Sequence, residues 1–318
     1  MKLSSLDINH HVSPVPHFPG GSREACRRWE SFFSSGLEEY NKGRSHPEEK
    51  GVSTLSPYLH FGHISTHHIL SDIFTKYNWN VGNIKPPHNG RRRGWWQLGE
   101  GVESFIDQVV VWRDLGHVHC ALVPDHDKYE SLPEWSRMTM EKHSLDRKKF
   151  TYSLEEFEES RTHDSLWNAA QTQLRRDGYI HNSLRMLWGK KILEWSTDPQ
   201  TAMETMVILN DKWALDGRDP NSYSGIGWVM GKFDREFGER EIYGTVRYMA
   251  SEQSKKKYET RKYLTTYDRR SSGTLLGQYL ELDHENVSKE PSHTRNVFAN
   301  NKRTPKGKKS SRIQTNYR

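Results

Sequence analysis

The sequence is poor in cysteine, with only Cys26 and Cys120 among its 318 residues. Two cysteines cannot build the disulfide framework of a small secreted domain, which indicates a reducing compartment such as the cytoplasm or the nucleus. The first residues lack the apolar core of a secretory signal peptide. No run of about 18 apolar residues occurs, which argues against a membrane-spanning helix. The sequence therefore predicts an intracellular protein that does not interact with membranes.

Several motifs of common enzyme classes are also missing. Short Val- and Ile-rich strands do not alternate with helices, and the glycines of GIGWVMG (225–231) have the wrong spacing for a dinucleotide-binding loop. The G-x-S-x-G elbow of serine hydrolases does not occur. The segment HVHC (117–120) has no second cluster at zinc-ligand spacing, so no metal site is predicted.

Tryptophan and basic residues are what the sequence has in quantity. Eleven tryptophans favour an aromatic core or stacking sites for flat ligands. The segment 289–318 carries nine Lys and Arg and one Glu, a net charge of +8, so the remainder of this +6 chain is slightly acidic at −2. Its composition is typical of a disordered arm. Such an arm is either a solvated tail, a contact for nucleic-acid phosphates or a nuclear address.

Apolar spacing predicts an all-α fold. We expect an extended leader over 1–21, a helical domain over 22–265, and a linker with a disordered basic tail over 266–318. Helices are predicted from Ser22 onward and, further along the chain, over Ser65–Lys76, Val102–His119, Ser153–Ser160, Asp164–Asp177, His181–Glu194 and Pro199–Leu209. The stretch Asp216–Tyr248 is predicted to be rich in loops.

Two short segments combine residue types suited to ligand binding. Thr54 and Ser56 lie in a turn stopped by a proline, where hydroxyls and free amides either cradle a phosphate or form a local ST-turn. Gln108 and Trp112 lie one helical turn apart, so an amide and an indole share a face that suits a nucleobase or belongs to the core.

A third segment, LRMLWGKKILEW (184–195), places Trp188 and Trp195 seven residues apart. Seven residues make almost two turns, so both indoles point to the same side of a helix. Asn182 and Arg185 are three residues apart and share a face. A fixed guanidinium there needs an anionic partner, for which Asp216 is attractive although the sequence alone does not pair them.

Six blocks of the sequence together resemble one family, the flavin-binding domain of DNA photolyases, and most closely its class II branch for cyclobutane pyrimidine dimers. The blocks are STLSPYLHFGHIS (53–65), VWRDLG (111–116), THDSLWNAAQ (162–171), HNSLRMLWGKKILEW (181–195), LNDKWALDGRDPNSYSG (209–225) and YGTVRYM (243–249). They occur in the family's order and cover roughly residues 14–264. The resemblance implies a helical photolyase/cryptochrome fold that binds FAD.

The resemblance also implies roles for individual residues. Those implied to bind FAD are Tyr40, Ser53, Thr54, Leu55, Ser56, Arg113, Asn182, Arg185, Asn210 and Asp216, with Arg185 paired to Asp216 and Asn210 beside flavin N5. Trp112 and Trp228 would flank a flipped lesion, and Gln108 would contact its base carbonyls. Trp188, Trp167 and Trp195 would form an electron-transfer chain, with Trp188 nearest the flavin and Trp195 nearest solvent.

The chain departs from the family pattern in two ways. Gln108 stands where the family has a glutamate, and an amide cannot exchange a proton. Asp107 would project about 100° away on an α-helix and is expected to be a poor substitute. The matching region also starts almost at Met1, so the family's N-terminal antenna domain is expected to be absent or supplied by a separate polypeptide.

The leading functional hypothesis is a deoxyribodipyrimidine photo-lyase, a monomer that repairs flipped pyrimidine dimers in UV-damaged DNA by electron transfer from photoexcited reduced FAD. A cryptochrome-like flavin photoreceptor without repair activity is the first alternative. An inactive fragment without its antenna domain is the second.

Overall fold

The computed structural model describes residues 5–8, 10–47, 51–85, 94, 96–258 and 260–268. Contacts between Cα atoms group the chain into Met1–Leu280 and Glu281–Arg318, and every described residue belongs to the first group. The predicted basic tail, and all but the first three residues of the predicted segment 266–318, lie outside the described residues.

Helices make up the regular structure, as predicted, and no strand occurs among the described residues. The N-terminal helices are α1 (Ser22–Ser35), α2 (Tyr40–Gly43), α3 (Ser56–His60), α4 (Thr66–Lys76), η2 (Val81–Asn83), α5 (Glu100–Ile106), the π-helical η3 (Asp107–Trp112), α6 (Arg113–Leu122) and η4 (Tyr129–Ser131). The others are α7 (Glu134–Lys142), α8 (Leu154–Glu158), α9 (Ser165–Asp177), α10 (Asn182–Trp195), α11 (Pro199–Trp213), α12 (Pro220–Val229), α13 (Ser251–Lys257) and α14 (Thr260–Thr266).

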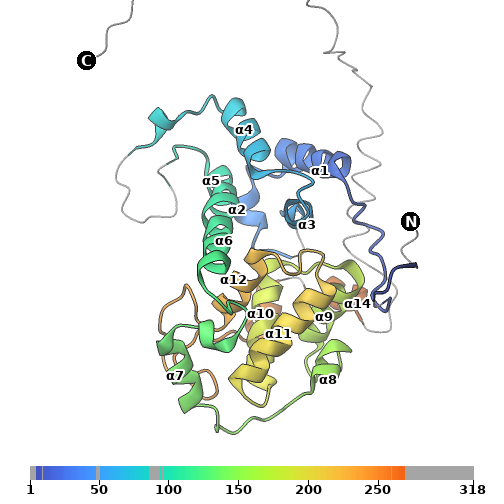
Figure 1. The fold of residues 1–318 in the computed structure, drawn as a ribbon, viewed down its shortest axis with the longest axis vertical. Helices are drawn as coiled ribbons and strands as arrows, with labels where there is room; N and C mark the ends of the chain where they lie inside the picture. The colour runs from blue at the N-terminus through green and yellow to red at the C-terminus, as the bar shows by residue number, and fades with distance from the viewer. Residues whose placement is uncertain are drawn as a thin grey trace, which may run out of the picture. The chain divides into compact units, whose positions relative to one another are not determined.

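The buried apolar residues form two clusters. The first lies on α1, α3, α4 and α5 and centres on Trp29, which stacks against Phe105 at 5.9 Å between ring centroids. The second cluster is larger and is built mainly by α9, α10, α11 and α12. Figure 1 shows α9, α10 and α11 side by side, and α10 contacts both neighbours as well as α12.

Local sequence signals explain where the central helices begin. Asp164, Asp198 and Asp219 each cap a helix by accepting hydrogen bonds from backbone amides of the first turn. Proline follows the cap in α11 and α12, where its missing N–H costs nothing.

The prediction of a loop-rich stretch over Asp216–Tyr248 is wrong in its first half, because α12 occupies Pro220–Val229. Its composition, with Gly225, Gly227 and two serines, has low intrinsic helix propensity. Packing against α6, α10 and α11 stabilises this helix instead.

Two glycines allow the helices around α12 to approach closely. A Cβ atom on Gly116 of α6 would lie 3.1 Å from the carbonyl oxygen of Pro220. A Cβ atom on Gly189 of α10 would lie 2.8 Å from Val229 Cγ2. A Cβ atom at Gly189 would force its neighbours to shift, and one at Gly116 would be tighter than most real contacts, so both glycines favour the observed close packing.

Candidate functional site

Arg185 contacts two other residues that are predicted to bind a flavin. Its Nη1 donates to Asn210 Oδ1 at 3.1 Å, and its Nη2 lies 3.3 Å from Asp216 Oδ1. The predicted pair of Arg185 with Asp216 is therefore confirmed. Asn210 is 3% exposed, and α10 and α11 hold the partners in place. The cluster presents a half-buried cation beside a neutral carboxamide.

A second ionic contact joins the start of α12 to α6 and lies beside α3. Asp219, the cap of α12, faces Arg113 Nη1 at 3.4 Å and His60 Nδ1 at 3.3 Å through the same carboxylate oxygen. Arg113 begins α6, and His60 ends α3. Because Asp219 precedes Pro220, the sequence marks it as a helix cap, but its contact with Arg113 was not predicted.

The turn at Ser53–Ser56 precedes and begins α3. Ser53 Oγ accepts from the Leu55 amide at 3.4 Å, so a local ST-turn is present, formed by Ser53 and not by Thr54 or Ser56. Thr54 has a left-handed backbone (φ 54°), and its Oγ1 accepts from Arg28 Nη1 at 3.1 Å. A non-glycine residue in this conformation is strained, and such strain often accompanies a binding site. Leu55 is buried, whereas Ser56 is half-buried.

Tyr40 begins α2 and stands edge-on to Phe32 and Phe105, at 5.8 and 5.2 Å between ring centroids. The Arg44 guanidinium lies 5.5 Å from the centre of the Tyr40 ring. Burial raises the pKa of Tyr40, so its hydroxyl stays protonated at neutral pH. It therefore offers a neutral hydroxyl, which suits a phosphate oxygen better than a phenolate would.

Asn182 is exposed at the first residue of α10, three residues before Arg185 on the same helix, and its predicted role in binding flavin stays a prediction. Its neighbour His181 is buried, and its Nδ1 accepts from the Ser183 amide at 3.2 Å. A neutral histidine that accepts at Nδ1 carries its proton at Nε2. Within the described part of the chain, this Nε2 has no hydrogen-bond partner. An orphaned buried donor is rare and indicates a site for a ligand or a bound water.

His181 predicts sensitivity to acid. Burial, with a smaller contribution from Arg44, His46 and Lys257, lowers its pKa to about 4. The unfolded chain, with a pKa near 6.5, binds the proton more tightly, so stability is present above about pH 6.5 and falls toward pH 4. The loss amounts to roughly 3 kcal/mol. Melting curves of wild type and His181→Asn over this range should show a flatter pH dependence in the variant, and parallel curves would contradict the assignment.

The three tryptophans of the predicted electron-transfer chain are buried and adjacent. Trp188 Nε1 donates to Gln171 Oε1 at 2.8 Å, and Trp167 Nε1 donates to the Trp188 carbonyl at 3.0 Å. The rings of Trp167 and Trp195 are 6.1 Å apart. Trp195 in turn lies 4.8 Å from the exposed His163. The predicted order of electron transfer runs from Trp188, nearest the flavin, through Trp167 to Trp195, nearest solvent. It stays a prediction, and the contacts between these three residues favour it.

The predicted lesion contacts come from two places. Gln108 and Trp112 lie on the π-helical η3, and both donate to Asp107 Oδ2, at 3.0 and 3.1 Å. The side chains of Asp107 and Gln108 are therefore in direct contact. Trp228 lies on α12, with the Arg247 guanidinium 5.3 Å and Lys190 Nζ 5.5 Å from its ring centre. Burial lowers the pKa of Lys190 to about 7.

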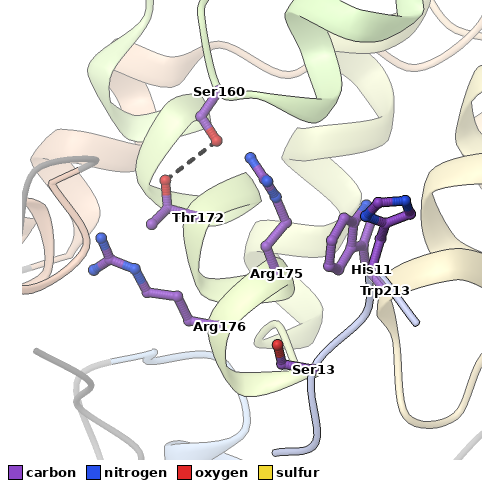
Figure 2. A pocket seen from close by; sticks show the side chains of 7 residues that line it. All are labelled: His11, Ser13, Ser160, Thr172, Arg175, Arg176 and Trp213. Carbon is purple, nitrogen blue, oxygen red and sulfur yellow. Dashed lines mark hydrogen bonds between the residues drawn. The ribbon is translucent and has the colours of Figure 1, made fainter. Parts of the chain in front are cut away.

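Figure 2 shows a pocket of about 340 Å³ beside α9. Its lining residues are His11, Ser13, Ser160, Thr172, Arg175, Arg176 and Trp213. Arg175 and Arg176 belong to the last turn of α9, where basic side chains offset the partial negative charge of a helix end. Arg175 also donates to the Glu158 carbonyl and stacks on Trp213. The pocket contains none of the predicted site residues.

The part of the chain that the structure describes contains no group of three or more His, Cys, Asp or Glu side chains able to hold a metal ion. In that same part, no helix is long and apolar enough to cross a membrane.

Comparison with known proteins adds sequence relatives that share most of this chain. No family model matches. The chain is 33% identical over 261 residues to the deoxyribodipyrimidine photo-lyase of Potorous tridactylus, covering 82% of this chain and 46% of the relative. It is 36% identical over 247 residues to the protein of that name from Methanothermobacter thermautotrophicus, covering 78% and 50%. The chain belongs to the photolyase/cryptochrome family. It spans about half the length of the curated relatives that it matches.

Solved structures of the photolyase/cryptochrome family support the helical fold. A cryptochrome from Synechocystis sp. PCC6803 matches with a TM-score of 0.54 at 16% identity, over 81% of this chain and 47% of that chain. A class III photolyase from Agrobacterium tumefaciens matches with a TM-score of 0.51 at 17% identity, over 86% and 51%.

Four residues position side chains of the candidate site through contacts that the sequence did not predict. Asp107, Gln171, His181 and Asp219 hold Trp112, Trp188, the start of α10 and Arg113, respectively. Only Asp219 carries a local signal, the Asp-Pro pair at a helix start. Asp107 acts through an irregular helix and Gln171 through a tertiary contact, whereas His181 caps α10 through the nearby Ser183 amide.

Proposed function

We propose that this chain provides the FAD-binding and electron-transferring part of a light-dependent DNA repair enzyme for cyclobutane pyrimidine dimers. The observation that carries this proposal is the contact of Arg185 with both Asn210 and Asp216, three residues before Trp188 on the same helix. A redox cofactor held there would be next to the first indole of a buried tryptophan series.

The side chains present fit FAD. Arg185 and Arg113 each keep donors beyond their contacts with Asp216 and Asp219, so they can still bind anionic or carbonyl groups of a ligand. The orphaned Nε2 of His181 supplies a further donor. Tyr40 and the strained Thr54 turn would bind the diphosphate. When bound and reduced, FAD supplies on illumination the electron that splits the dimer and then recovers it.

The protein's own contribution is positioning and shielding. Asn210 is uncharged, so it can hold a hydrogen bond to a flavin nitrogen without adding charge to a buried site. Its Oδ1 already accepts from Arg185, and its Nδ2 lies 3.3 Å from Asp211 Oδ1, which fixes the orientation of the amide.

The proposed substrate is DNA with a pyrimidine dimer flipped out of the duplex. Flipping costs a few kcal/mol, and less where the lesion has already weakened stacking. Trp112 and Trp228 would receive the flipped bases on their indole faces, and Gln108 would bond to the base edges. The basic segment 289–318, which lies outside the described residues, would add phosphate attraction.

The absorption spectrum of the purified full chain, before and after blue light with a reductant, tests this proposal. We expect flavin bands that bleach under light, followed by loss of dimers from an irradiated oligonucleotide. A protein that neither carries nor rebinds FAD would refute the proposal.

A cryptochrome-like photoreceptor is the second candidate. Gln108 favours it because an amide forms hydrogen bonds but cannot give up or take up a proton, as a glutamate can. This candidate predicts flavin bands that bleach without any loss of dimers. The same two measurements therefore separate the two candidates.

A further inference from the structure

Asp107 connects the two side chains that are proposed to meet the lesion from η3. A single carboxylate oxygen, Oδ2, accepts from Gln108 Nε2 at 3.0 Å and from Trp112 Nε1 at 3.1 Å. Asp107 is only 9% exposed, whereas Gln108 and Trp112 are half-buried. Both donors therefore share one mostly desolvated acceptor.

The π-helical form of η3 makes this arrangement possible. In an α-helix, residues 107 and 112 would point about 140° apart. The i to i+5 geometry of a π-helix brings residues five apart to the same side. Flanking residues Ile106 and Arg113 have ordinary helical backbones (φ −57° and −66°), so the irregularity is confined to this one turn. Single π turns inside helices occur frequently at functional sites.

The shared acceptor fixes the orientation of both partners. An indole has one N–H donor, so its bond to Asp107 selects one rotation of the Trp112 ring. A carboxylate only accepts hydrogen bonds, so the amino group of Gln108 must face Asp107 and its Oε1 must face away. The amide is therefore held with its carbonyl oxygen available to a donor such as the N3–H of a flipped thymine.

We infer that Asp107 is a positioning residue of the lesion pocket, which orients the Trp112 indole and the Gln108 amide for a flipped pyrimidine dimer. This inference rests on the proposed function, and it goes further by explaining how Gln108 serves in place of a glutamate. The Asp107 carboxylate lies one position before Gln108, and the hydrogen bond between them keeps it in contact with the residue proposed to read the base.

Dark binding of the full chain to an oligonucleotide with one thymine dimer, compared with the undamaged oligonucleotide, tests this inference. Asp107→Leu removes the acceptor, and we expect preference for the dimer to fall roughly tenfold to a hundredfold. Asp107→Asn keeps an acceptor oxygen and should retain most of the preference. Asp114→Leu, the same exchange at an exposed position of α6, is the matched control. Flavin content and light-driven bleaching should not change in any of the three variants.

Moving the carboxylate from position 107 to position 108 provides a second test. This test does not require that the Asp107→Leu variant folds. Gln108→Glu places two carboxylates about 3 Å apart, which should weaken dimer binding as pH rises. Asp107→Asn combined with Gln108→Glu restores a donor between them and should recover the lost preference.

Failure of the proposed function and failure of the role of Asp107 give different binding results. A wild-type protein without preference for the dimer would overturn the proposed function. A wild-type preference that Asp107→Leu retains, or a double variant no better than Gln108→Glu, would overturn the role of Asp107 alone.

Discussion

Trp188→Phe is expected to abolish light-driven reduction of bound flavin while leaving flavin content unchanged. Phenylalanine keeps most of the buried volume of Trp188, but it is much harder to oxidise than an indole and cannot relay the electron. The variant also loses the hydrogen bond to Gln171 Oε1. Losing that bond should cost on the order of 1 kcal/mol of stability. Bleaching of the flavin bands under blue light with a reductant measures the effect.

Two controls show whether the loss is specific to electron transfer. Trp79→Phe makes the same exchange at a half-buried tryptophan that stacks on Phe74, where the Trp79 indole donates to the Trp96 carbonyl at 2.8 Å, and should bleach normally. Chemically reduced Trp188→Phe should still repair dimers, because in the proposed function the reduced flavin, and not the tryptophan series, supplies the electron for repair. Normal photoreduction in Trp188→Phe would show that Trp188 is not part of the electron-transfer series.

Arg185→Met should remove flavin binding and destabilise the fold. Methionine fills the space of the side chain but leaves Asp216 and Asn210, both largely buried, without their donor. Breaking one side of a buried pair of this kind costs about 2–4 kcal/mol. For a domain of this size the melting temperature should fall by roughly 5–10 °C. Thermal melts and the flavin-to-protein absorbance ratio measure the two effects.

The charge left behind on Asp216 can be separated from the lost contact with flavin. Arg185→Met combined with Asp216→Asn should regain part of the stability, because no unpaired carboxylate remains, yet it should still lack flavin. Arg161→Met breaks an exposed ion pair with Glu155 and should cost less than about 1 kcal/mol. Full flavin content in Arg185→Met would remove Arg185 from the binding site.

The helices that the sequence predicts best are those with both a cap and a long apolar stripe. Asp164 and Asp198 mark the starts of α9 and α11, and both helices begin within one residue of the prediction. The missed helix α12 has its cap and proline, but its glycines and serines give it the composition of a loop. Its stability comes from close packing with α6 and α10, which depends on residues more than 30 positions away in the chain.

For the candidate site too, some contacts were predicted from the sequence and others depend on the local backbone or on distant residues. The pair of Arg185 with Asp216 was expected from the family resemblance and is present. Asn182 lies three residues before Arg185 on α10, as the helical spacing implies, but it is exposed, and its contact with flavin stays a prediction. The contact of Asp107 with Trp112 was out of reach, because it needs a π turn and periodicity arguments assume an α-helix.

Gly116 has a consequence for how the proposed substrate would be accommodated. It puts the backbone of α6 directly against the start of α12, and the helical runs on these two sides carry Trp112 and Trp228. A hinge requires a layer of side chains that can slide or repack, and none is interposed at this point. The distance between the Trp112 and Trp228 indoles should therefore stay constant when a substrate binds. For the proposed function, the deformation needed for recognition then falls on the DNA, and duplexes that bend easily at the damage should be bound first.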